Sequence, residues 1–428
     1  MSTYITITFL LLLLFLFMKV PVFISILSAS AAYFLMNTDV NAQILAQKFL
    51  TGCENVGLLA IPFFSAAGIF MNYSTITSKI LDFCSIITGR MVGGLAQVNV
   101  LLSTFMGGLS GSNLADAAMQ SKLLVPEMVK RGYSLEFSAV ITGVTSLITP
   151  LIPPGIAMIL YGTIAGLSIG RMFTAGLGLG ILLCAACMIM VHFISKKRGY
   201  ERMRTEKVTG KEFWAAFKPA IAPLCLPIII IGGIRIGVFT AVEAGAVSVA
   251  YALALGFYYR VLDLKTVIQG FKETAISTST VMVIVGAATV FAWVMTKERI
   301  PQILAETMAN SIASKYVFLL AVNVFLLLVG MFVEGSAALI VLVPILAPVA
   351  AQFGIDPIHF AMVVIFNMSI GNLTPPLGTV MFVVCGITKC PTSKFIKECI
   401  PFFGMMLILL LVITDVPWVS TGLVSLLY

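Results

Sequence analysis

Long apolar blocks recur from one end of the chain to the other, separated by short polar segments. Most of these blocks approach the roughly 20 residues that a helix needs to cross about 30 Å of hydrocarbon. The blocks in the first part of the chain are 4–18, 20–36, 55–72, 136–163 and 172–194. The later blocks are 219–236, 239–258, 276–296, 357–387 and 395–415. The pattern predicts an all-α protein that crosses a membrane many times.

Two further apolar regions are interrupted by small polar residues. Residues 93–128 contain "GGLSGSNLAD", and residues 325–351 contain "EGSAA". Each half of these regions is too short to cross the hydrocarbon alone. We therefore expect two helical hairpins that enter the membrane and return on the same side.

Two of the long blocks contain a run of prolines. "TPLIPPG" occupies 149–155 within the block 136–163, and "NLTPPLG" occupies 372–378 within the block 357–387. Proline lacks a backbone donor and clashes with the preceding turn of a helix. Both blocks are therefore predicted to be broken helices, whose unwound backbone must be satisfied by protein, water or a bound ion.

The hairpins and broken helices repeat at a constant distance in the sequence. One common shift along the chain superposes five glycines and prolines of each half, namely Gly108 on Gly330, Pro126 on Pro348, Gly132 on Gly354, Pro153 on Pro375, and Pro154 on Pro376. This shared shift predicts two structural repeats, 1–195 and 219–428, joined by the linker 196–218. Coincidence is the alternative in a chain with 35 glycines and 18 prolines.

The turns after the two hairpins predict opposite orientations in the membrane. "PEMVKRGYS" carries Lys130 and Arg131, whereas "PVAAQFGIDP" carries no basic residue. Because Lys and Arg concentrate on the cytoplasmic side, the repeats are expected to be inverted. Inverted repeats with broken helices that meet near the midplane are typical of secondary transporters.

Composition supports this interpretation and excludes several others. The chain is 60% hydrophobic and 10% charged, and eight of its 26 Lys and Arg lie between Lys196 and Lys218. This basic cluster indicates a cytoplasmic loop, so the net charge of +8 does not indicate nucleic-acid binding. The eight cysteines are scattered, which indicates helix packing. No Walker A motif or H-E-x-x-H motif occurs, so ATP hydrolysis by this chain is not expected.

The side chains at the breaks offer oxygen atoms. The candidate ligands in the first half are Ser110, Ser112, Asn113, Thr149 and the carbonyls around Pro150 and Ile152. Those in the second half are Glu334, Ser336, Asn372 and Thr374. Oxygen ligands suit small hard cations and argue against a transition metal. The alternative is that small polar residues simply allow the hairpin tips to pack tightly.

Charged residues within apolar runs are a second group of candidates. Glu334 is expected to act on the cation side, because a carboxylate in a membrane segment is functional by default. Its alternative is a hairpin-tip acid in water. Glu243 lies where a helix dipole favours an acid, so a structural role is the simpler interpretation. Lys297 and Arg299 mark the end of a span or meet a carboxylate of the substrate.

Two other functions remain possible from the residues alone. "GLSG" at 108–111 resembles the motif around the serine of rhomboid-type intramembrane proteases, with Ser110 as the nucleophile. Such a serine needs a base, and the two histidines are His192 and His359, both outside the interrupted segments. A channel would also use polar breaks, but it would need no moving hairpins.

Taken together, "GGLSGSNLADAA", "TPLIPPG", "EGSAALIVLVPIL" and "IGNLTPPLG" resemble the large membrane subunit of the tripartite ATP-independent periplasmic (TRAP) transporters. The resemblance covers nearly the whole chain. It implies a sodium-coupled importer of organic acids in the bacterial inner membrane, with Na⁺ as the coupling ion and no other cofactor. It also implies a small four-helix membrane partner, a periplasmic substrate-binding protein, and an elevator mechanism in which hairpins and broken helices move against a scaffold.

The resemblance also implies positions for the ligands. It places one sodium site at Ser110 and Asn113, with backbone from Thr149 to Pro154. It places a second near Gly335, Asn372 and Thr374, beside Glu334. Substrate would lie between the hairpin tips near Ser112 and Ser336, with Lys297 as a further candidate. Sialic acid and C4-dicarboxylates are the expected substrate classes, and the sequence as a whole most resembles the sialic-acid branch of the family.

Overall fold

The computed structural model describes residues 3–18, 20–74, 76–311, 314–376 and 378–428, and over these residues its regular structure is entirely helical. Leu377, inside the expected second break, lies outside the described residues. The helices of the first half are α1 (Thr3–Phe17), α2 (Val22–Met36), α3 (Gln43–Cys53), α4 (Ala60–Tyr73), α5 (Ile76–Thr88), α6 (Gly94–Ser110), α7 (Asn113–Lys130), α8 (Leu135–Thr145), α9 (Ile156–Ala165) and α10 (Ile169–Arg198). Those of the second half are α11 (Gly210–Arg235), α12 (Ala241–Tyr258), α13 (Leu264–Lys297), α14 (Ile300–Ser311), α15 (Lys315–Gly330), α16 (Gly335–Gln352), α17 (Pro357–Gly371), α18 (Thr379–Thr388), α19 (Thr392–Asp415) and α20 (Pro417–Leu427).

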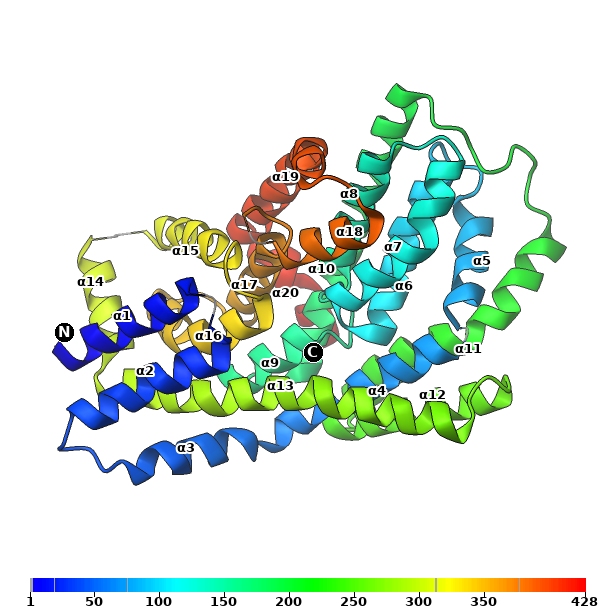
Figure 1. The fold of residues 1–428 in the computed structure, drawn as a ribbon. Helices are drawn as coiled ribbons and strands as arrows, with labels where there is room; N and C mark the ends of the chain where they lie inside the picture. Colours follow the sequence, from blue (N-terminus) through cyan, green and yellow to red (C-terminus); the bar gives the residue numbers. More distant parts are fainter. Residues whose placement is uncertain (1–2, 19, 75, 312–313, 377) are drawn as a thin grey trace.

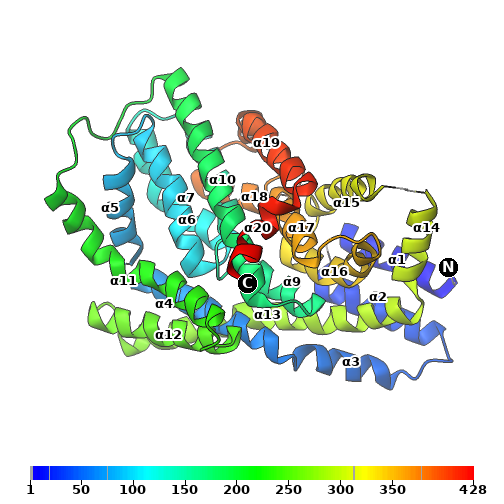
Figure 2. The same ribbon diagram turned by 180° about the vertical axis from the view of Figure 1, so that it is seen from behind.

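The helices form two groups. Helices α2, α3 and α4 pack along the long helix α13, and α12 packs on α4; together with α1 and α11 they make an outer layer along one side of the molecule (Figure 1). Helices α6–α10 and α15–α20 pack together as a second group, which we call the hairpin body (Figure 2). The short helices α5 and α14 connect the outer layer to the hairpins. At 34 residues, α13 is longer than the hydrocarbon is thick.

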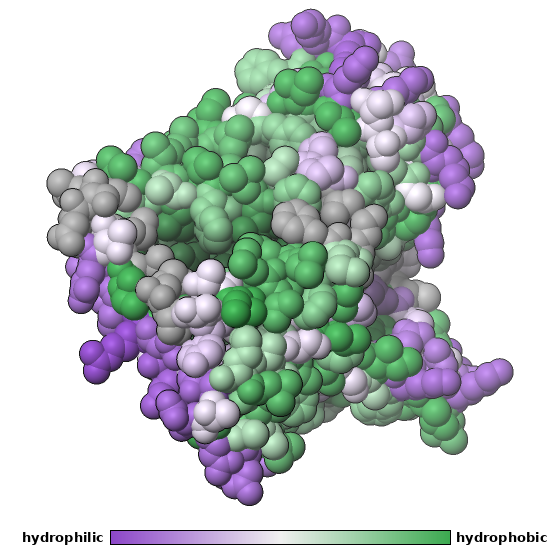
Figure 3. All heavy atoms as spheres, turned by 60° about the vertical axis from the view of Figure 1, so that its left-hand side comes forward, coloured by the Kyte–Doolittle hydropathy of each residue, from purple (hydrophilic) through white to green (hydrophobic). Residues whose placement is uncertain are grey.

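The surface has the character of a membrane protein. Within the described part of the chain, seven helices are long and apolar enough to span a membrane by length and composition. One face of the molecule is mostly hydrophobic, with hydrophilic residues gathered toward its margins (Figure 3). Many large apolar residues are exposed, among them Leu35, Ile228 and Trp418. Lipid therefore takes the place that water has around a soluble protein.

The interrupted and proline-containing regions fold as hairpins and broken helices. The first hairpin is α6–α7 and the second is α15–α16, which begins at Lys315, ahead of the expected boundary at residue 325. The first broken helix is α8 followed by a 3-10 turn (Ser146–Ile148), an irregular segment and α9. The second is α17, an irregular segment and α18. The unwound segments coincide with the two proline runs, which is where the backbone donors are missing.

Helix starts in the two halves recur at the same spacing. Helix α7 begins at Asn113 and α16 at Gly335, and the shift between them is the one that carries Gly108 onto Gly330. Helix α8 begins at Leu135 and α17 at Pro357, and this pair is related by the same shift. The order of short connecting helix, hairpin, broken helix and long helix is the same in α5–α10 as in α14–α19.

Some elements differ from the sequence-based expectations. Helices α3, α5, α14 and α20 were not expected, because each is shorter than a membrane span. Helix α10 continues to Arg198 and α11 begins at Gly210, so the segment between these helices is shorter than the expected linker 196–218. Thr209 and Glu212 form a capping box that fixes the start of α11.

Buried amide side chains join each hairpin to its broken helix. In the first half, the Asn99 amide donates to Thr142 Oγ1 (2.8 Å) and accepts from Thr145 Oγ1 (2.8 Å). In the second half, the Asn367 amide donates to Asn323 Oδ1 (2.9 Å). All five side chains are almost completely buried. Each link ties the first helix of a hairpin to the helix that precedes the break.

Packing at the second break leaves no space for an added methyl group. A Cβ atom at Gly371 would lie 2.6 Å from the Cα atom of Gly330. We expect Gly371→Ala to lower the free energy of unfolding by about 1–3 kcal/mol through overpacking. Gly404→Ala is the matched control, because Gly404 lies in α19 with nothing within 4 Å of its added Cβ atom. Melting temperatures of the purified variants in detergent measure the effect, and equal melting temperatures would contradict the close approach.

Candidate functional site

The tip of the first hairpin lies directly against the first break. Gly111 has a φ of 61°, and this left-handed conformation ends α6 and turns the chain into α7. Its carbonyl accepts a hydrogen bond from the backbone N–H of Ile156 (3.4 Å). A Cβ atom on Gly111 would collide with the carbonyl oxygen of Pro154. Only glycine therefore allows the hairpin backbone to approach the unwound backbone this closely.

The second hairpin meets the second break through a side chain. The backbone N–H of Gly335 donates to Asn372 Oδ1 (3.1 Å), and Asn372 is almost completely buried. The Asn372 carbonyl accepts from the backbone N–H of Val380 (2.9 Å), which closes the irregular segment before α18. Asn372 thus satisfies backbone groups of both the hairpin tip and the break.

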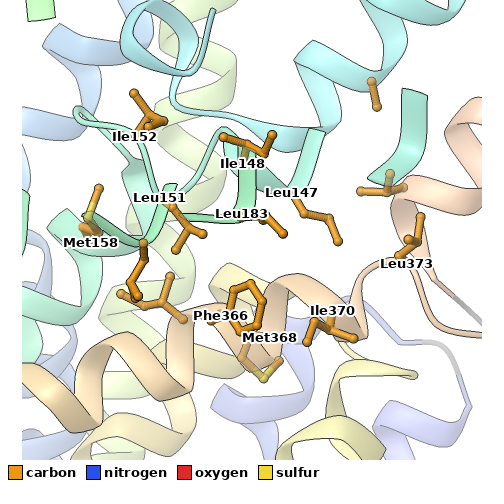
Figure 4. Packing of buried hydrophobic residues seen from close by; sticks show 14 of the residues in the cluster. Leu147, Ile148, Leu151, Ile152, Met158, Leu183, Phe366, Met368, Ile370 and Leu373 are labelled. Carbon is orange, nitrogen blue, oxygen red and sulfur yellow. The ribbon is translucent and has the colours of Figure 1, made fainter. Parts of the chain in front are cut away.

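An apolar layer lies between the two breaks. Side chains from the first break and from α17 pack against one another in this layer (Figure 4). The figure labels Leu147, Ile148 and Leu151 on the side of the first break, and Phe366, Met368 and Ile370 on the side of α17. All six are at most 2% exposed. The two breaks are therefore held in a fixed relation by a common core.

A cavity of about 330 Å³ opens between the two hairpin tips. Its walls come from both tips, from both broken helices and from α13 of the outer layer. The polar residues that line it are Ser112, Asn113, Ser277, Thr280, Glu334, Ser336, Ser369 and Asn372. Among the described residues that line this cavity, Glu334 is the one with a charged side chain. A volume of this size suits a small organic molecule.

The residues predicted for the first cation site are brought together. Ser110 and Asn113 flank the hairpin tip, and Asn113 and Pro150 both line the cavity. Thr149 is fully buried, and the Cα atom of Thr149 lies 3.1 Å from the Cβ position of Gly107 in α6. The Ser110 hydroxyl is buried and makes no hydrogen bond to any described residue. A buried hydroxyl without a partner can contribute an oxygen to a hard cation, although Ser110 itself does not line the cavity and its Cα atom lies against Gly68 of α4.

Ile152 and Pro154 contribute only backbone to this arrangement. The Ile152 side chain packs toward Gly107 and Gly180 and is 5% exposed. The Pro154 carbonyl oxygen faces Gly111, at the tip of the hairpin. This carbonyl of the break therefore lies next to the residue that follows Ser110.

The residues predicted for the second cation site are also close together. Gly335 and Asn372 are hydrogen-bonded, and Glu334 precedes Gly335 in the chain. Glu334 caps α16 by accepting the backbone N–H of Ala337 (3.0 Å), and it also lines the cavity. The Thr374 hydroxyl donates a hydrogen bond to the Ile370 carbonyl (2.8 Å). Its proton is therefore engaged, while the lone pairs of its oxygen can still bind a cation.

The three candidate substrate contacts are placed differently. Ser112, which caps the start of α7, and Ser336, in the first turn of α16, both line the cavity. Lys297 does not line it and is exposed in the last turn of α13. It lies about 25 Å beyond Thr280 along one helix, from the rise of about 1.5 Å per residue. Glu243 caps α12 in a capping box with Thr240, which is the structural role expected for it.

Four polar residues at or near the site were not singled out from the sequence. Ser277 and Thr280 of α13 and Ser369 of α17 line the cavity, and no local pattern sets them apart from other hydroxyls in those helices. Asp116 is 2% exposed and lies behind the first hairpin tip. Its carboxylate accepts from Ser103 Oγ (2.7 Å) and Thr149 Oγ1 (3.2 Å). The rule that marked Glu334, a carboxylate inside an apolar run, also applies to Asp116.

The geometry does not support a serine protease. Ser110 makes no hydrogen bond to a histidine in the described part of the chain. His359 is hydrogen-bonded to Ser420 (2.8 Å), near the start of α17 and away from the tips, and it is 2% exposed. A serine without a base is a weak nucleophile. The described residues also contain no group of three or more His, Cys, Asp or Glu side chains that could hold a metal ion.

Solved structures share this fold at low sequence identity. The crystal structure of the YdaH transporter of Alcanivorax borkumensis aligns with a TM-score of 0.64 and 16% identity, covering 97% of this chain and 99% of that one. The likeness concerns the fold alone.

Known sequences identify the family. The sequence model of the protein family described as "Tripartite ATP-independent periplasmic transporter, DctM component" matches residues 9–419. The sialic acid TRAP transporter large permease protein SiaM of Vibrio cholerae is 38% identical over 398 residues, which is 93% of each chain. The C4-dicarboxylate large permease protein DctM of Pseudomonas aeruginosa is 35% identical over 93% of this chain and 92% of its own length. The sialic acid permease protein SiaT of Haemophilus influenzae is 36% identical over 95% of this chain but 66% of its own length.

The resemblance seen in the motifs is thereby confirmed, whereas relatives named for different acids at similar identity leave the sialic-acid branch unassigned. The broken helices, the paired hairpins and the shared cavity described above are features of a transporter. The family match over residues 9–419 means that this chain belongs to the DctM component family of the TRAP transporters. It is a multi-pass transporter subunit of the bacterial inner membrane and not an enzyme.

Proposed function

We propose that this chain is the sodium-coupled membrane subunit of an importer of an organic acid, and that it moves its substrate by an elevator mechanism. The observation that carries the proposal is the cavity in which both hairpin tips and both breaks meet. Backbone unwound at this depth persists only where it lines a site or is buried in protein. One cavity bordered by both breaks can hold a substrate and its coupling ions side by side.

Sodium coupling is supported by the donor atoms at the breaks. Site one comprises Ser110, Asn113 and the carbonyls from Thr149 to Pro154, and it includes the orphaned Ser110 hydroxyl. Site two comprises Gly335, Asn372 and Thr374, with Glu334 at its edge. Every side-chain donor is an oxygen, which favours a hard cation such as Na⁺. Na⁺ is here a transported ion, taken up and released in each cycle.

Recognition of the acid falls to backbone dipoles. No basic side chain lines the cavity among the described residues, so a substrate carboxylate has no Lys or Arg partner there. Helices α7 and α16 both begin at the cavity, so the positive ends of both helix dipoles face it and favour an anion, although the N–H groups of Gly335 and Ala337 are already bonded to Asn372 and Glu334. Sialic acid is the first substrate to test, because SiaM and SiaT carry that name, and a C4-dicarboxylate is the second.

Partner subunits follow from the family and from the length of one relative. SiaT is longer than this chain, which spans 66% of it. The remaining third of SiaT has room for the small four-helix subunit, which we propose as a partner of this chain. A periplasmic binding protein is proposed to deliver the acid, as the family description indicates.

The elevator proposal is supported by the division into two groups of helices. The hairpins and broken helices pack on one another, and they contact the outer layer along α4, α11 and α13. Recurrence of helix starts at one common shift supports two repeats of common origin, and the basic turn after α7 supports their inverted orientation. A channel needs none of this, and saturable uptake coupled to sodium distinguishes the two.

If Ser110 and Asn113 bind Na⁺, Ser110→Ala and Asn113→Ala should each raise the sodium concentration for half-maximal uptake several-fold. The reason is that each removes one oxygen ligand while leaving the fold in place. Uptake by reconstituted vesicles across a sodium series measures this. Thr104→Ala is the matched control, because Thr104 lies on the same helix as Ser110 and its hydroxyl donates to the Val100 carbonyl (2.9 Å). An unchanged half-saturation in both variants would remove this site.

If the repeats are inverted, the turns after the two hairpins lie on opposite sides of the membrane. Lys130→Cys and Gln352→Cys place a thiol at exposed positions at the ends of α7 and α16. In a cysteine-free background we expect membrane-impermeant reagents to label position 352 from outside and position 130 only from the cytoplasmic side. Labelling of both positions from one side would refute the inverted arrangement.

The tripartite proposal predicts that uptake needs every component. We expect uptake only with the small subunit, a binding protein loaded with sialic acid or a dicarboxylate, and an inward sodium gradient. Vesicles with the same components and no gradient are the control. Robust uptake of free acid by this chain alone would contradict the role of the binding protein, and uptake that ignores sodium would contradict the paired cation sites.

A further inference from the structure

Asp116 is a buried carboxylate in the first turn of α7, and it does not line the cavity. Its oxygens accept three hydrogen bonds, from Ser103 Oγ (2.7 Å), Gln120 Nε2 (2.8 Å) and Thr149 Oγ1 (3.2 Å). These partners come from α6, α7 and the first break, so the carboxylate connects both arms of the hairpin to the unwound backbone. All four side chains are at most 2% exposed.

No basic side chain balances this carboxylate. None of the ion pairs among the described residues involves Asp116, and its three partners are neutral. Hydrogen bonds alone stabilise a buried carboxylate only in part, so an ionised Asp116 calls for a positive charge nearby. Thr149 connects Asp116 directly to the break whose carbonyls form the first cation site. The positive charge is therefore available whenever a cation occupies that site.

The second half of the molecule lacks this arrangement. At the shift that relates the two halves, Ala338 stands in place of Asp116, Leu342 in place of Gln120, and Gly371 in place of Thr149. The carboxylate of the second hairpin, Glu334, instead corresponds to Ser112 and lines the cavity. Each hairpin thus has one carboxylate near the start of its second helix. Of these two carboxylates, only Asp116 is fully buried, and it is hydrogen-bonded to Thr149 of the first break.

We propose that Asp116 is a positioning residue that supplies the fixed negative charge for the cation at the first site, acting through Thr149. This inference rests on the proposed sodium coupling. The carboxylate holds the Thr149 side chain and places a negative charge behind the carbonyls that face the ion. Because it does not line the cavity, it can attract the cation without touching the substrate acid. The first site therefore binds sodium more tightly than it would by neutral oxygens alone.

The decisive variant is Asp116→Asn, which removes the charge and nearly preserves the shape. We expect the sodium concentration for half-maximal uptake to rise about tenfold or more, with the maximal rate at saturating sodium largely retained. A second measurement needs no transport. Sodium should raise the melting temperature of the purified wild-type chain, and the variant should need a correspondingly higher sodium concentration for the same rise.

Two matched variants separate charge from packing. Ser103→Ala removes one hydrogen bond to Asp116 and keeps the charge, so it should lower the melting temperature while leaving the sodium half-saturation within about twofold. Thr149→Val removes the link between Asp116 and the break, whereas Thr149→Ser retains the hydroxyl. We expect the valine variant to shift sodium half-saturation and the serine variant to leave it nearly unchanged. This pair also tests the proposal if Asp116→Asn does not fold.

The outcomes distinguish this inference from the proposed function. If sodium affects neither uptake nor melting of the wild-type chain, sodium coupling itself is wrong. If the wild type responds to sodium and Asp116→Asn has the same half-saturation, coupling stands and the role of Asp116 is refuted. If Ser103→Ala shifts the half-saturation as far as Asp116→Asn, the cluster acts by packing, and the proposal is again refuted.

Discussion

Backbone polar groups in a membrane must find partners inside the protein, and the centre of this molecule is arranged around that constraint. The proline runs unwind two helices within membrane-spanning segments, where lipid offers the freed backbone groups no hydrogen-bond partners. The first break is met by Gly111, whose carbonyl accepts the N–H of Ile156, and the second by Asn372, which serves Gly335 and Val380. Glycine is required at the first tip because another backbone must come close. These contacts leave the buried hydroxyl of Ser110 without a hydrogen-bond partner among the described residues, and the proposed sodium site would give it one.

The central elements could be predicted because their signals are local. Proline runs and small polar clusters interrupt apolar blocks, and they marked the hairpins, both breaks and the closeness of Ser110 and Asn113 to the first break. Ser277 and Thr280 could not be predicted in the same way, because they join the site only when α13 packs across the hairpin tips. Lys297 does not line the cavity, and a basic residue at the end of a span has the same sequence pattern whether it meets a substrate or water. Helices α5 and α14 were missed because they are too short to give a spanning signal.

The two halves follow one backbone plan with different polar chemistry. Helix starts recur at the same spacing, and each hairpin is tied to its broken helix by buried amides, Asn99 in one half and Asn323 with Asn367 in the other. The acids differ: Asp116 is buried behind its hairpin tip, whereas Glu334 caps its helix and borders the cavity. A duplicated plan fixes where backbone is unwound, and single side chains then decide what each break can hold. Symmetry of the fold therefore does not require symmetry of the ions.

The part played by α13 has a consequence for how such a cavity is inherited and altered. Four of the contributing elements belong to the hairpin body, while Ser277 and Thr280 belong to the outer layer. If the hairpin body slides, a bound molecule keeps four walls and exchanges the fifth for another stretch of the same long helix. A substitution on that helix would then act at one stage of the cycle and leave the others untouched. The outer layer can in this way set how long a bound molecule stays enclosed, while the hairpin body sets how tightly the molecule is bound.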